Sequence, residues 1–390
     1  MRVLLVGALV GSAAGVPLAA QPDSLPTRAR AIGLAPGIFR PGPHNAITDV
    51  DGVRVGHGTL TAGDSIRSGV TAILPHAGNV FRARVPAAMA VGNGFGKLLG
   101  GTQLAELGHL ETPIVLTCTL CIWSVADGLV RELLAGIDMA RVRSINPVVG
   151  ETNDGTLNAT RSRPGIQDAM RTALRSATPG PVAEGSVGAG AGTVMFGWKG
   201  GIGTSSRRLP ARLGGWTVGV LVQGNYGGVL EMGGVPMGRL LGQYAFQGDV
   251  DSTVAPKTPP DAAGDGSVMI VIATDAPLLD RNLRRLAQRS FLGLAHTGSS
   301  ASNGSGDYAI AFSTHADVRI DPDRPRLSFT EIGNDALSPL FQAVVEATEE
   351  ALLNAMLMAT SVTTRERTVE ALPLARVRAL LEARGIRPPR

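Results

Sequence analysis

The 390-residue sequence is short of aromatic residues, charges and cysteines, and these shortages limit what the protein can be. Aromatic residues make up 4% of the chain, and the basic residues behind the net charge of +4 are scattered rather than clustered. A nucleic-acid-binding face needs a basic stripe with interleaved aromatics, so we expect no nucleic-acid partner. Past the N-terminus no apolar run is long enough to span a bilayer, so we expect no membrane association in the mature form.

Sequence patterns that hold metals or nucleotides are missing as well. None of the six histidines falls in an H-E-x-x-H spacing, and no glycine-rich segment closes with Gly-Lys-Ser or Gly-Lys-Thr. The run Gly188–Thr193 lacks the downstream features of a dinucleotide site. No G-x-S-x-G elbow stands in the strand-to-helix context of a hydrolase. We therefore expect neither a metal nor a cofactor.

The two cysteines, Cys118 and Cys121, form a C-x-x-C pattern inside the apolar run from Ile114 to Trp123. A thioredoxin-like motif opens a helix after a strand and usually carries Gly or Pro between its cysteines. Here the pair lies within continuous apolar sequence. We interpret both as small buried core residues rather than as a redox pair.

The first 20 residues resemble a targeting segment. Arg2 precedes an apolar stretch from Val3 to Val10, and small residues follow as far as Ala20. This order of charge, short apolar run and small residues is typical of a secretory signal peptide. We predict a signal peptide over residues 1–20 and a periplasmic or secreted mature protein.

The remaining chain has the composition of a globular protein, with 44% hydrophobic residues and 51 glycines in no collagen-like period. Apolar runs of strand length alternate with helical patterns, which predicts one α/β domain over residues 30–390. Asp51-Gly52 in the segment 46–57 predicts a hairpin turn. The apolar run 268–273 predicts a buried strand that follows a Pro-, Asp- and Gly-rich loop over 249–264.

Ser267 stands at the boundary between that loop and that strand, directly after Gly266. A self-cleaving precursor needs this arrangement, because Gly266 tolerates the strained backbone required when a hydroxyl attacks the preceding carbonyl. Cleavage would leave Ser267 as a new N-terminus whose α-amine can serve as base for its own hydroxyl. An ordinary loop followed by an ordinary strand explains the same residues, and local sequence alone favours that interpretation.

Three polar, glycine-flanked segments add candidates for chemistry, over residues 150–158, 223–228 and 297–308. Asn225 ends an apolar strand between glycines, so its amide is a candidate oxyanion donor. Turn chemistry explains the same residues, since Asn, Asp and Gly favour turns.

Taken in order, four motifs make a specific combination. They are Asn-Pro-Val-Val-Gly-Glu-Thr-Asn-Asp-Gly, Gln-Gly-Asn-Tyr-Gly, Asp-Gly-Ser and Asn-Gly-Ser-Gly-Asp, at 146–155, 223–227, 265–267 and 303–307. Together they resemble the self-cleaving β-aminopeptidases and L-aminopeptidase D-amidase/D-esterases, over about residues 30 to 360. The resemblance implies a four-layer α/β/β/α sandwich like that of the N-terminal-nucleophile hydrolases, with different strand connectivity. It also implies an α-chain ending at Gly266, a β-chain starting at Ser267, and homotetramers of such αβ units.

The resemblance further assigns roles by matching positions. Ser267 matches the nucleophile, and Ser305 matches a second serine that lies near the amine and hydroxyl of the nucleophile. Asp307 matches an acidic residue that is Glu in some members, and Asn225 matches the asparagine of the oxyanion hole. No cofactor is implied.

Two further residues are candidates for substrate binding. Glu151 is expected to pair with the N-terminal ammonium of a substrate. Thr156 stands near the place where the family has a tyrosine donor. The expected substrates are small peptides, amino-acid amides or esters, cleaved through an acyl-enzyme.

Two other functions fit parts of the same pattern. One is an acyltransferase of the ornithine-acetyltransferase type, which cleaves itself before a threonine, whereas Ser267 is a serine. The other is an inactive periplasmic binding protein on the same scaffold, which would stay uncut.

Overall fold

A computed structural model of the protein describes residues 25–253 and 266–388, so the predicted signal peptide lies outside the described residues. Its larger sheet has the strand order β10-β11-β12-β13-β3-β5, with β12 and β13 parallel. The strands are β3 (Val85–Gly94), β5 (His109–Leu110), β10 (Gly201–Arg208), β11 (Thr217–Asn225), β12 (Ser267–Thr274) and β13 (Gly306–Ser313).

The second sheet has the order β1-β2-β6-β7-β4, with β6 and β7 parallel. Its strands are β1 (Arg54–Ala62), β2 (Ile66–Leu74), β4 (Leu98–Leu99), β6 (Ile114–Cys118) and β7 (Val148–Thr152). Two hairpins complete the strands: β8 (Val194–Met195) with β9 (Trp198–Lys199), and β14 (Val362–Thr363) with β15 (Thr368–Val369).

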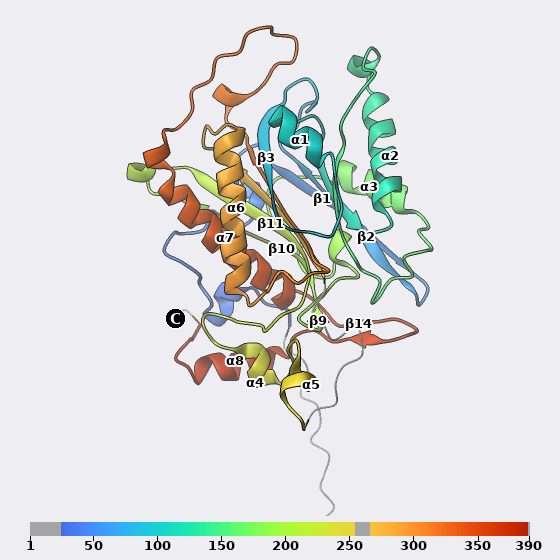
Figure 1. Ribbon diagram of the computed structural model, residues 1–390, viewed down its shortest axis with the longest axis vertical. Helices are drawn as coiled ribbons and strands as arrows, with labels where there is room; N and C mark the ends of the chain where they lie inside the picture. Colours follow the sequence, from blue (N-terminus) through green and yellow to red (C-terminus); the bar gives the residue numbers. More distant parts are fainter. Residues whose placement is uncertain (1–24, 254–265, 389–390) are drawn as a thin grey trace, which may run out of the picture.

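Helices cover the outer face of each sheet (Figure 1). The α-helices are α1 (Gly101–Leu107), α2 (Ile122–Leu134), α3 (Ile166–Arg175), α4 (Met237–Leu241), α5 (Gln247–Val250), α6 (Asp280–His296), α7 (Ser338–Leu357) and α8 (Leu374–Glu382). The α2–α3 pair packs on the smaller sheet, and α6 and α7 pack on the larger one. The layers therefore run α/β/β/α, as the family resemblance implied.

The central strand β12 shows why the layers pack in this order. All eight of its residues are buried. Val268, Ile270 and Ile272 point toward the α6–α7 layer, while Met269 and Val271 point into the core between the sheets. Successive side chains of a strand point to opposite faces, so a continuous apolar run suits a strand that is covered on both sides.

The segments before and after residue 266 are interleaved rather than separate. Strands β12 and β13 lie between β11 and β3 in the larger sheet. A buried ion network adds to this: Arg207 of β10 pairs with Glu346 at 3.1 Å and with Glu350 at 2.8 Å, both on α7. Removing one member of such a network leaves a buried charge without a partner, which typically costs about 3–5 kcal/mol. A chain cut before residue 267 would therefore stay assembled.

Two features differ from the sequence-based expectations. The segment 46–57 is not a hairpin, because Ile47–Asp49 forms a 3-10 turn and β1 pairs with β2 instead. The Ile47 amide donates to the Thr204 hydroxyl at 2.8 Å, a contact from a distant strand that the local Asp-Gly signal cannot reveal. Strand β10 was not anticipated, since its Gly-, Ser- and Thr-rich sequence reads as a loop.

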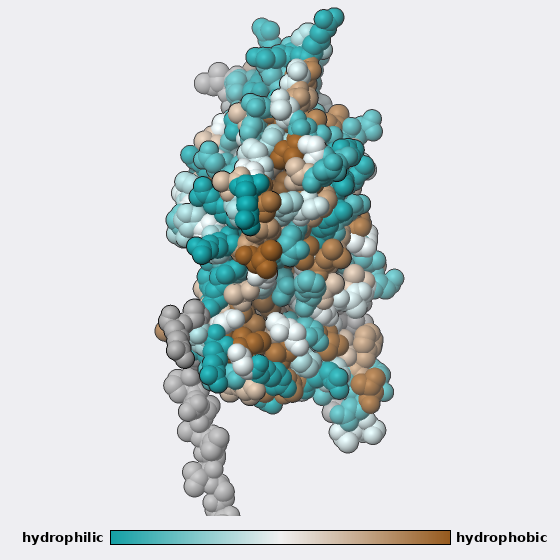
Figure 2. All heavy atoms as spheres, turned by 90° about the vertical axis from the view of Figure 1, so that its left-hand side faces the viewer, coloured by the Kyte–Doolittle hydropathy of each residue, from teal (hydrophilic) through white to brown (hydrophobic). Residues whose placement is uncertain are grey.

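The outer face on the α6–α7 side carries mostly hydrophilic side chains, with hydrophobic ones in small scattered groups (Figure 2). Scattered apolar groups of this kind are normal for a protein surface. No helix among the described residues is long and apolar enough to cross a membrane.

Candidate active site

Ser267 begins β12, where three strand ends meet. It pairs with Asn225 at the end of β11 on one side and with Gly306 at the start of β13 on the other. The residue is buried, with 5% of its surface exposed. Three of the predicted site segments, far apart in sequence, are thus brought together by sheet register alone.

Gly266 lies against the backbone of the neighbouring strand. A Cβ added to it would stand 2.0 Å from the Asn225 carbonyl oxygen and 2.5 Å from the Tyr226 Cα. Both contacts are with main-chain atoms, which cannot rotate away as a flexible side chain can. The close backbone approach explains why glycine precedes Ser267, a reason that the sequence-based argument from strain did not include.

The Gly306 amide contacts the Ser267 hydroxyl and the oxygen of the Gly266 carbonyl, the two groups that would react in self-cleavage. Its N–H lies 3.2 Å from the Gly266 carbonyl oxygen and 3.2 Å from the Ser267 Oγ. A backbone N–H held at a carbonyl oxygen is suited to stabilise the negative charge that develops when a nucleophile attacks that carbonyl. The sequence analysis missed this donor, although it stands between Ser305 and Asp307.

The side-chain amide of Asn225 has a defined orientation. Its Oδ1 accepts a hydrogen bond from the Val194 backbone N–H at 2.9 Å. Because a backbone N–H can only donate, the atom facing Val194 must be the oxygen, and the Nδ2 group is left as the donor. Nδ2 has no hydrogen-bond partner within the described ranges. Asn225 can therefore donate to an oxyanion.

Behind Asn225 lies a buried lysine that the sequence did not single out. Lys199 pairs with Val194 in the β8–β9 hairpin, and its Nζ donates to the carbonyls of Gly190 at 2.8 Å and Gly200 at 2.7 Å. Burial lowers the pKa of Lys199 to about 7, although the nearby Asp154 charge acts in the opposite direction. The lysine thus fixes the hairpin that presents the Val194 amide to Asn225.

Ser305 and Asp307 form a buried pair beside the nucleophile. The Ser305 hydroxyl donates to Asp307 Oδ1 at 2.6 Å, and Oδ2 is buried without a partner in the described part of the chain. Burial raises the pKa of Asp307, while the bond from Ser305 acts to lower it. The pair is connected to Ser267 through the intervening Gly306.

Glu151, at the end of β7, approaches this site from the second sheet. Its Oε1 accepts hydrogen bonds from the Lys97 backbone N–H at 2.9 Å and from the Lys97 Nζ at 3.3 Å. A Cβ added to Gly96 would lie 2.9 Å from the Gly306 Cα and 3.3 Å from Glu151 Oε1. Gly96 therefore lies between the start of β13 and the Glu151 carboxylate and is close to both. Oε2 of Glu151 is buried and unpaired among the described residues.

Thr156 lies in the turn after β7 and is half-buried. No hydrogen bond connects it with Ser267, Asn225 or Glu151 in the segments that the structure describes. Its assignment to substrate binding stays a prediction. Tyr308 is a hydroxyl donor nearer to the strand ends, since its OH donates to the Gly96 carbonyl at 2.9 Å.

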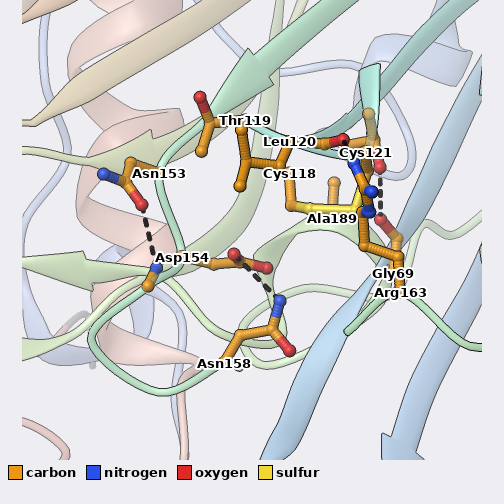
Figure 3. Close-up of a disulfide and its surroundings, with 12 residues drawn as sticks. Gly69, Cys118, Thr119, Leu120, Cys121, Asn153, Asp154, Asn158, Arg163 and Ala189 are labelled. Carbon is orange, nitrogen blue, oxygen red and sulfur yellow. Dashed lines mark hydrogen bonds between the residues drawn. A yellow bond between two sulfur atoms is a disulfide. The ribbon is translucent and has the colours of Figure 1, made fainter. Parts of the chain in front are cut away.

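The interpretation of the two cysteines was wrong in one respect. Both are buried, as expected, but they are joined in a disulfide between the end of β6 and the start of α2 (Figure 3). The disulfide closes a four-residue turn that contains Thr119 and Leu120. The Thr119 Oγ1 accepts a hydrogen bond from Lys97 Nζ at 2.9 Å, so this turn belongs to the surroundings of Glu151.

No hydrogen bond among the described residues links a histidine with Ser267, Asn225 or Glu151. No group of three or more His, Cys, Asp or Glu residues suited to hold a metal occurs in the described ranges. His57, the most deeply perturbed histidine, lies in the second sheet, where burial lowers its pKa to about 4. Titratable groups that do lie beside Ser267 or Glu151 are the Asp307 carboxylate, the Lys97 ammonium and the Tyr308 hydroxyl.

Comparisons with known proteins find similar sequences and structures over most of the chain. The profile of peptidase family S58 matches residues 45–369. The β-peptidyl aminopeptidase BapA of Sphingosinicella microcystinivorans is 39% identical over 382 residues, which cover 95% of each chain. A β-aminopeptidase from Burkholderia sp. superposes with a TM-score of 0.82 at 40% identity, over 93% of this chain and 100% of that one. The L-aminopeptidase D-Ala-esterase/amidase of Ochrobactrum anthropi, described as a variant of the Ntn hydrolase fold, gives 0.81 at 35% identity, over 92% and 99%.

Proposed function

The chain belongs to peptidase family S58 and is an aminopeptidase-type hydrolase, and we propose that it works with an N-terminal serine which it creates by cutting itself between Gly266 and Ser267. The observation that carries this proposal is the shared contact of the Gly306 amide with the Ser267 hydroxyl and the Gly266 carbonyl. This contact supports the proposal because it joins the proposed nucleophile and the proposed target carbonyl through one backbone donor.

Self-cleavage proceeds in two balanced steps. The Ser267 Oγ attacks the Gly266 carbonyl carbon, and the C–N bond breaks as the hydroxyl proton passes to the Ser267 nitrogen. The acyl group has then moved from nitrogen to oxygen as an ester. Water then hydrolyses the ester, which leaves a carboxylate on Gly266 and a free α-amine on Ser267. The Gly306 N–H stabilises the tetrahedral oxyanion of both steps.

Peptide hydrolysis uses the same hydroxyl with a new base. The neutral α-amine of Ser267 takes the proton from Oγ as Oγ attacks the substrate carbonyl, and then gives it to the leaving amine. The acyl-enzyme ester is hydrolysed by water. Asn225 Nδ2 donates to the oxyanion, since its Oδ1 is held by Val194. Asp307, with Ser305, supplies negative charge near the amine.

Glu151 recognises the N-terminal ammonium of the substrate. Its Oε2 is a buried acceptor with no partner among the described residues, beside the site rather than within it. A buried carboxylate oxygen without a partner is costly, and an incoming ammonium removes that cost. This contact restricts cleavage to the first residue of a chain and makes the enzyme an aminopeptidase rather than an endopeptidase.

The substrates are small peptides, amino-acid amides or esters with a free amine, and we propose that residues of the β-amino-acid type are accepted. The support is the naming of similar proteins as β-peptidyl aminopeptidase and β-aminopeptidase. We also propose export, because the disulfide between Cys118 and Cys121 fits an oxidising compartment, where disulfides persist. The homotetramer stays a prediction.

The proposal is tested with p-nitroanilides of β-alanine, L-alanine and D-alanine. We expect release of p-nitroaniline by the wild type and none by Ser267→Ala, with N-acetylated substrates inert for both. Cleavage of the N-acetylated compounds would show that the ammonium is not required. Transfer of the acyl group to an added amine in place of water would favour an acyltransferase.

A further inference from the structure

Lys97 carries the same chemical group as the substrate that Glu151 is proposed to bind. Its ammonium lies 3.3 Å from Glu151 Oε1, and it is partly exposed, with 38% of the side chain accessible. Because Oε1 and Oε2 belong to one carboxylate, an ammonium held at Oε1 is also close to Oε2. One of them, Oε2, is the oxygen proposed for the substrate.

Resting on the proposed function of Glu151, we infer that Lys97 is an internal competitor for the ammonium subsite and that the disulfide-closed turn at Thr119 holds it away from Oε2. The Lys97 Nζ donates to Thr119 Oγ1 at 2.9 Å while it contacts Oε1. These two contacts keep the lysine on the far oxygen. Thr119 is thus a positioning residue that acts through Lys97.

The turn that carries Thr119 is fixed at both ends. Cys118 ends β6 and is paired with Thr152, the neighbour of Glu151, while Cys121 precedes the first residue of α2. The disulfide joins them across the turn, and Arg163 donates to the Leu120 carbonyl at 2.7 Å. Figure 3 shows the turn and the sulfur bridge beside the segment that follows β7.

Glu151 does not need the lysine side chain to stay in position. The backbone N–H of residue 97 donates to Oε1 at 2.9 Å and is retained whatever side chain stands there. Loss of the Lys97 ammonium therefore removes the competitor and leaves the carboxylate oriented. Loss of Thr119 leaves the competitor in place but frees it.

These two changes consequently have opposite effects on KM. Thr119→Val keeps every charge of the site, and we expect KM to rise about two- to fivefold, as when the binding-competent fraction falls to about one half to one fifth. The value of kcat should stay within about twofold, because ground-state and transition-state binding are weakened alike. Lys97→Met should leave KM unchanged or lower it, and Thr119→Val added to Lys97→Met should have no further effect.

The disulfide offers an independent arm of the same test. A phosphine reductant supplies two electrons and converts the bridge to two thiols, which intact mass confirms. Reduction of the wild type, or the Cys118→Ala/Cys121→Ala variant, should raise KM as Thr119→Val does. Neither should change KM in the Lys97→Met background. Thr102→Val is the matched threonine control, because Thr102 is an exposed residue of α1, and this variant should match the wild type.

Specific outcomes overturn the inference. Additive effects of Lys97→Met and Thr119→Val, or a rise of KM in Lys97→Met alone, would show that Lys97 does not compete. A reduced enzyme with unchanged KM would show that the disulfide does not hold Thr119. Glu151→Gln separates this inference from the proposed function. An unchanged KM in Glu151→Gln refutes the ammonium site itself. A raised KM in Glu151→Gln, together with a raised KM in Thr119→Val that Lys97→Met does not rescue, refutes only the competition.

Discussion

Gly266→Ala is the perturbation whose effect follows most directly from the geometry. The added Cβ would stand 2.0 Å from the Asn225 carbonyl oxygen, whereas real Cβ atoms essentially never come closer than 3.0 Å to another heavy atom. Either the Gly266 peptide or the end of β11 must therefore move by about 1 Å. Both belong to the self-cleavage geometry, and a misplacement of about 1 Å can slow a reaction about 10²-fold.

The assay is the time course of maturation of freshly purified precursor on a denaturing gel. We expect the band for residues 267–390 to appear about 10²-fold more slowly in Gly266→Ala than in the wild type. Gly333→Ala is the matched control, because a Cβ there has no atom within 4 Å and the backbone has φ −65°. Its maturation should be normal. A Gly266→Ala precursor that matures at the wild-type rate would refute the steric argument, provided that its thermal stability matches that of Ser267→Ala.

Three further predictions concern the residues around the nucleophile. Asn225→Ala should lower kcat about 10²–10³-fold with little change in KM, and a change confined to KM would show that Asn225 only shapes the pocket. The acidic limb of kcat/KM should report the Ser267 α-amine, with a pKa between roughly 6.5 and 8.5. Asp307→Asn should move that limb to lower pH, because a negative charge that favours the ammonium is lost. A limb that stays in place or moves to higher pH contradicts this prediction. Burial lowers the pKa of Lys199 from 10.5 to about 7, so between these pH values the folded state binds fewer protons than the unfolded state. The free energy of unfolding, relative to that of Lys199→Met, should therefore rise with pH from about 7 to 10.5, by at most ~1.4 kcal/mol per pH unit. Urea unfolding of the uncut Ser267→Ala background at pH 7 and pH 9 measures that slope, and equal differences at both pH values would contradict the prediction.

The buried strand β12 could be predicted from the sequence for a physical reason. Strand β12 is apolar along its whole length because it is covered on both faces, so its start at Ser267 is visible in the sequence. Strand β10 is buried as far as Arg207 but is rich in glycine, serine and threonine. The Thr204 hydroxyl donates to the Val220 carbonyl, and the Ser206 hydroxyl donates to the Asp49 carboxylate. Polar residues that are satisfied by tertiary partners do not produce an apolar pattern, so this strand could not be predicted.

The parts of the site that escaped prediction depend on distances in space. Gly306 acts through its backbone, which carries no sequence signal beyond the residue type. Lys97 and Lys199 matter because of what surrounds them, and a lone lysine next to a glycine predicts only a surface residue. A C-x-x-C pattern in apolar sequence does not distinguish two buried thiols from a disulfide, since the pairing depends on the turn between β6 and α2.

The central claim is that Ser267 becomes an N-terminal nucleophile through self-cleavage. Intact mass and N-terminal sequencing of the purified wild type test it directly. We predict two chains that remain associated, the smaller one beginning Ser-Val-Met-Ile, and a single uncut and inactive chain for Ser267→Ala. An active wild type that remains one uncut chain, or a Ser267→Ala protein that still splits at this bond, would contradict the account.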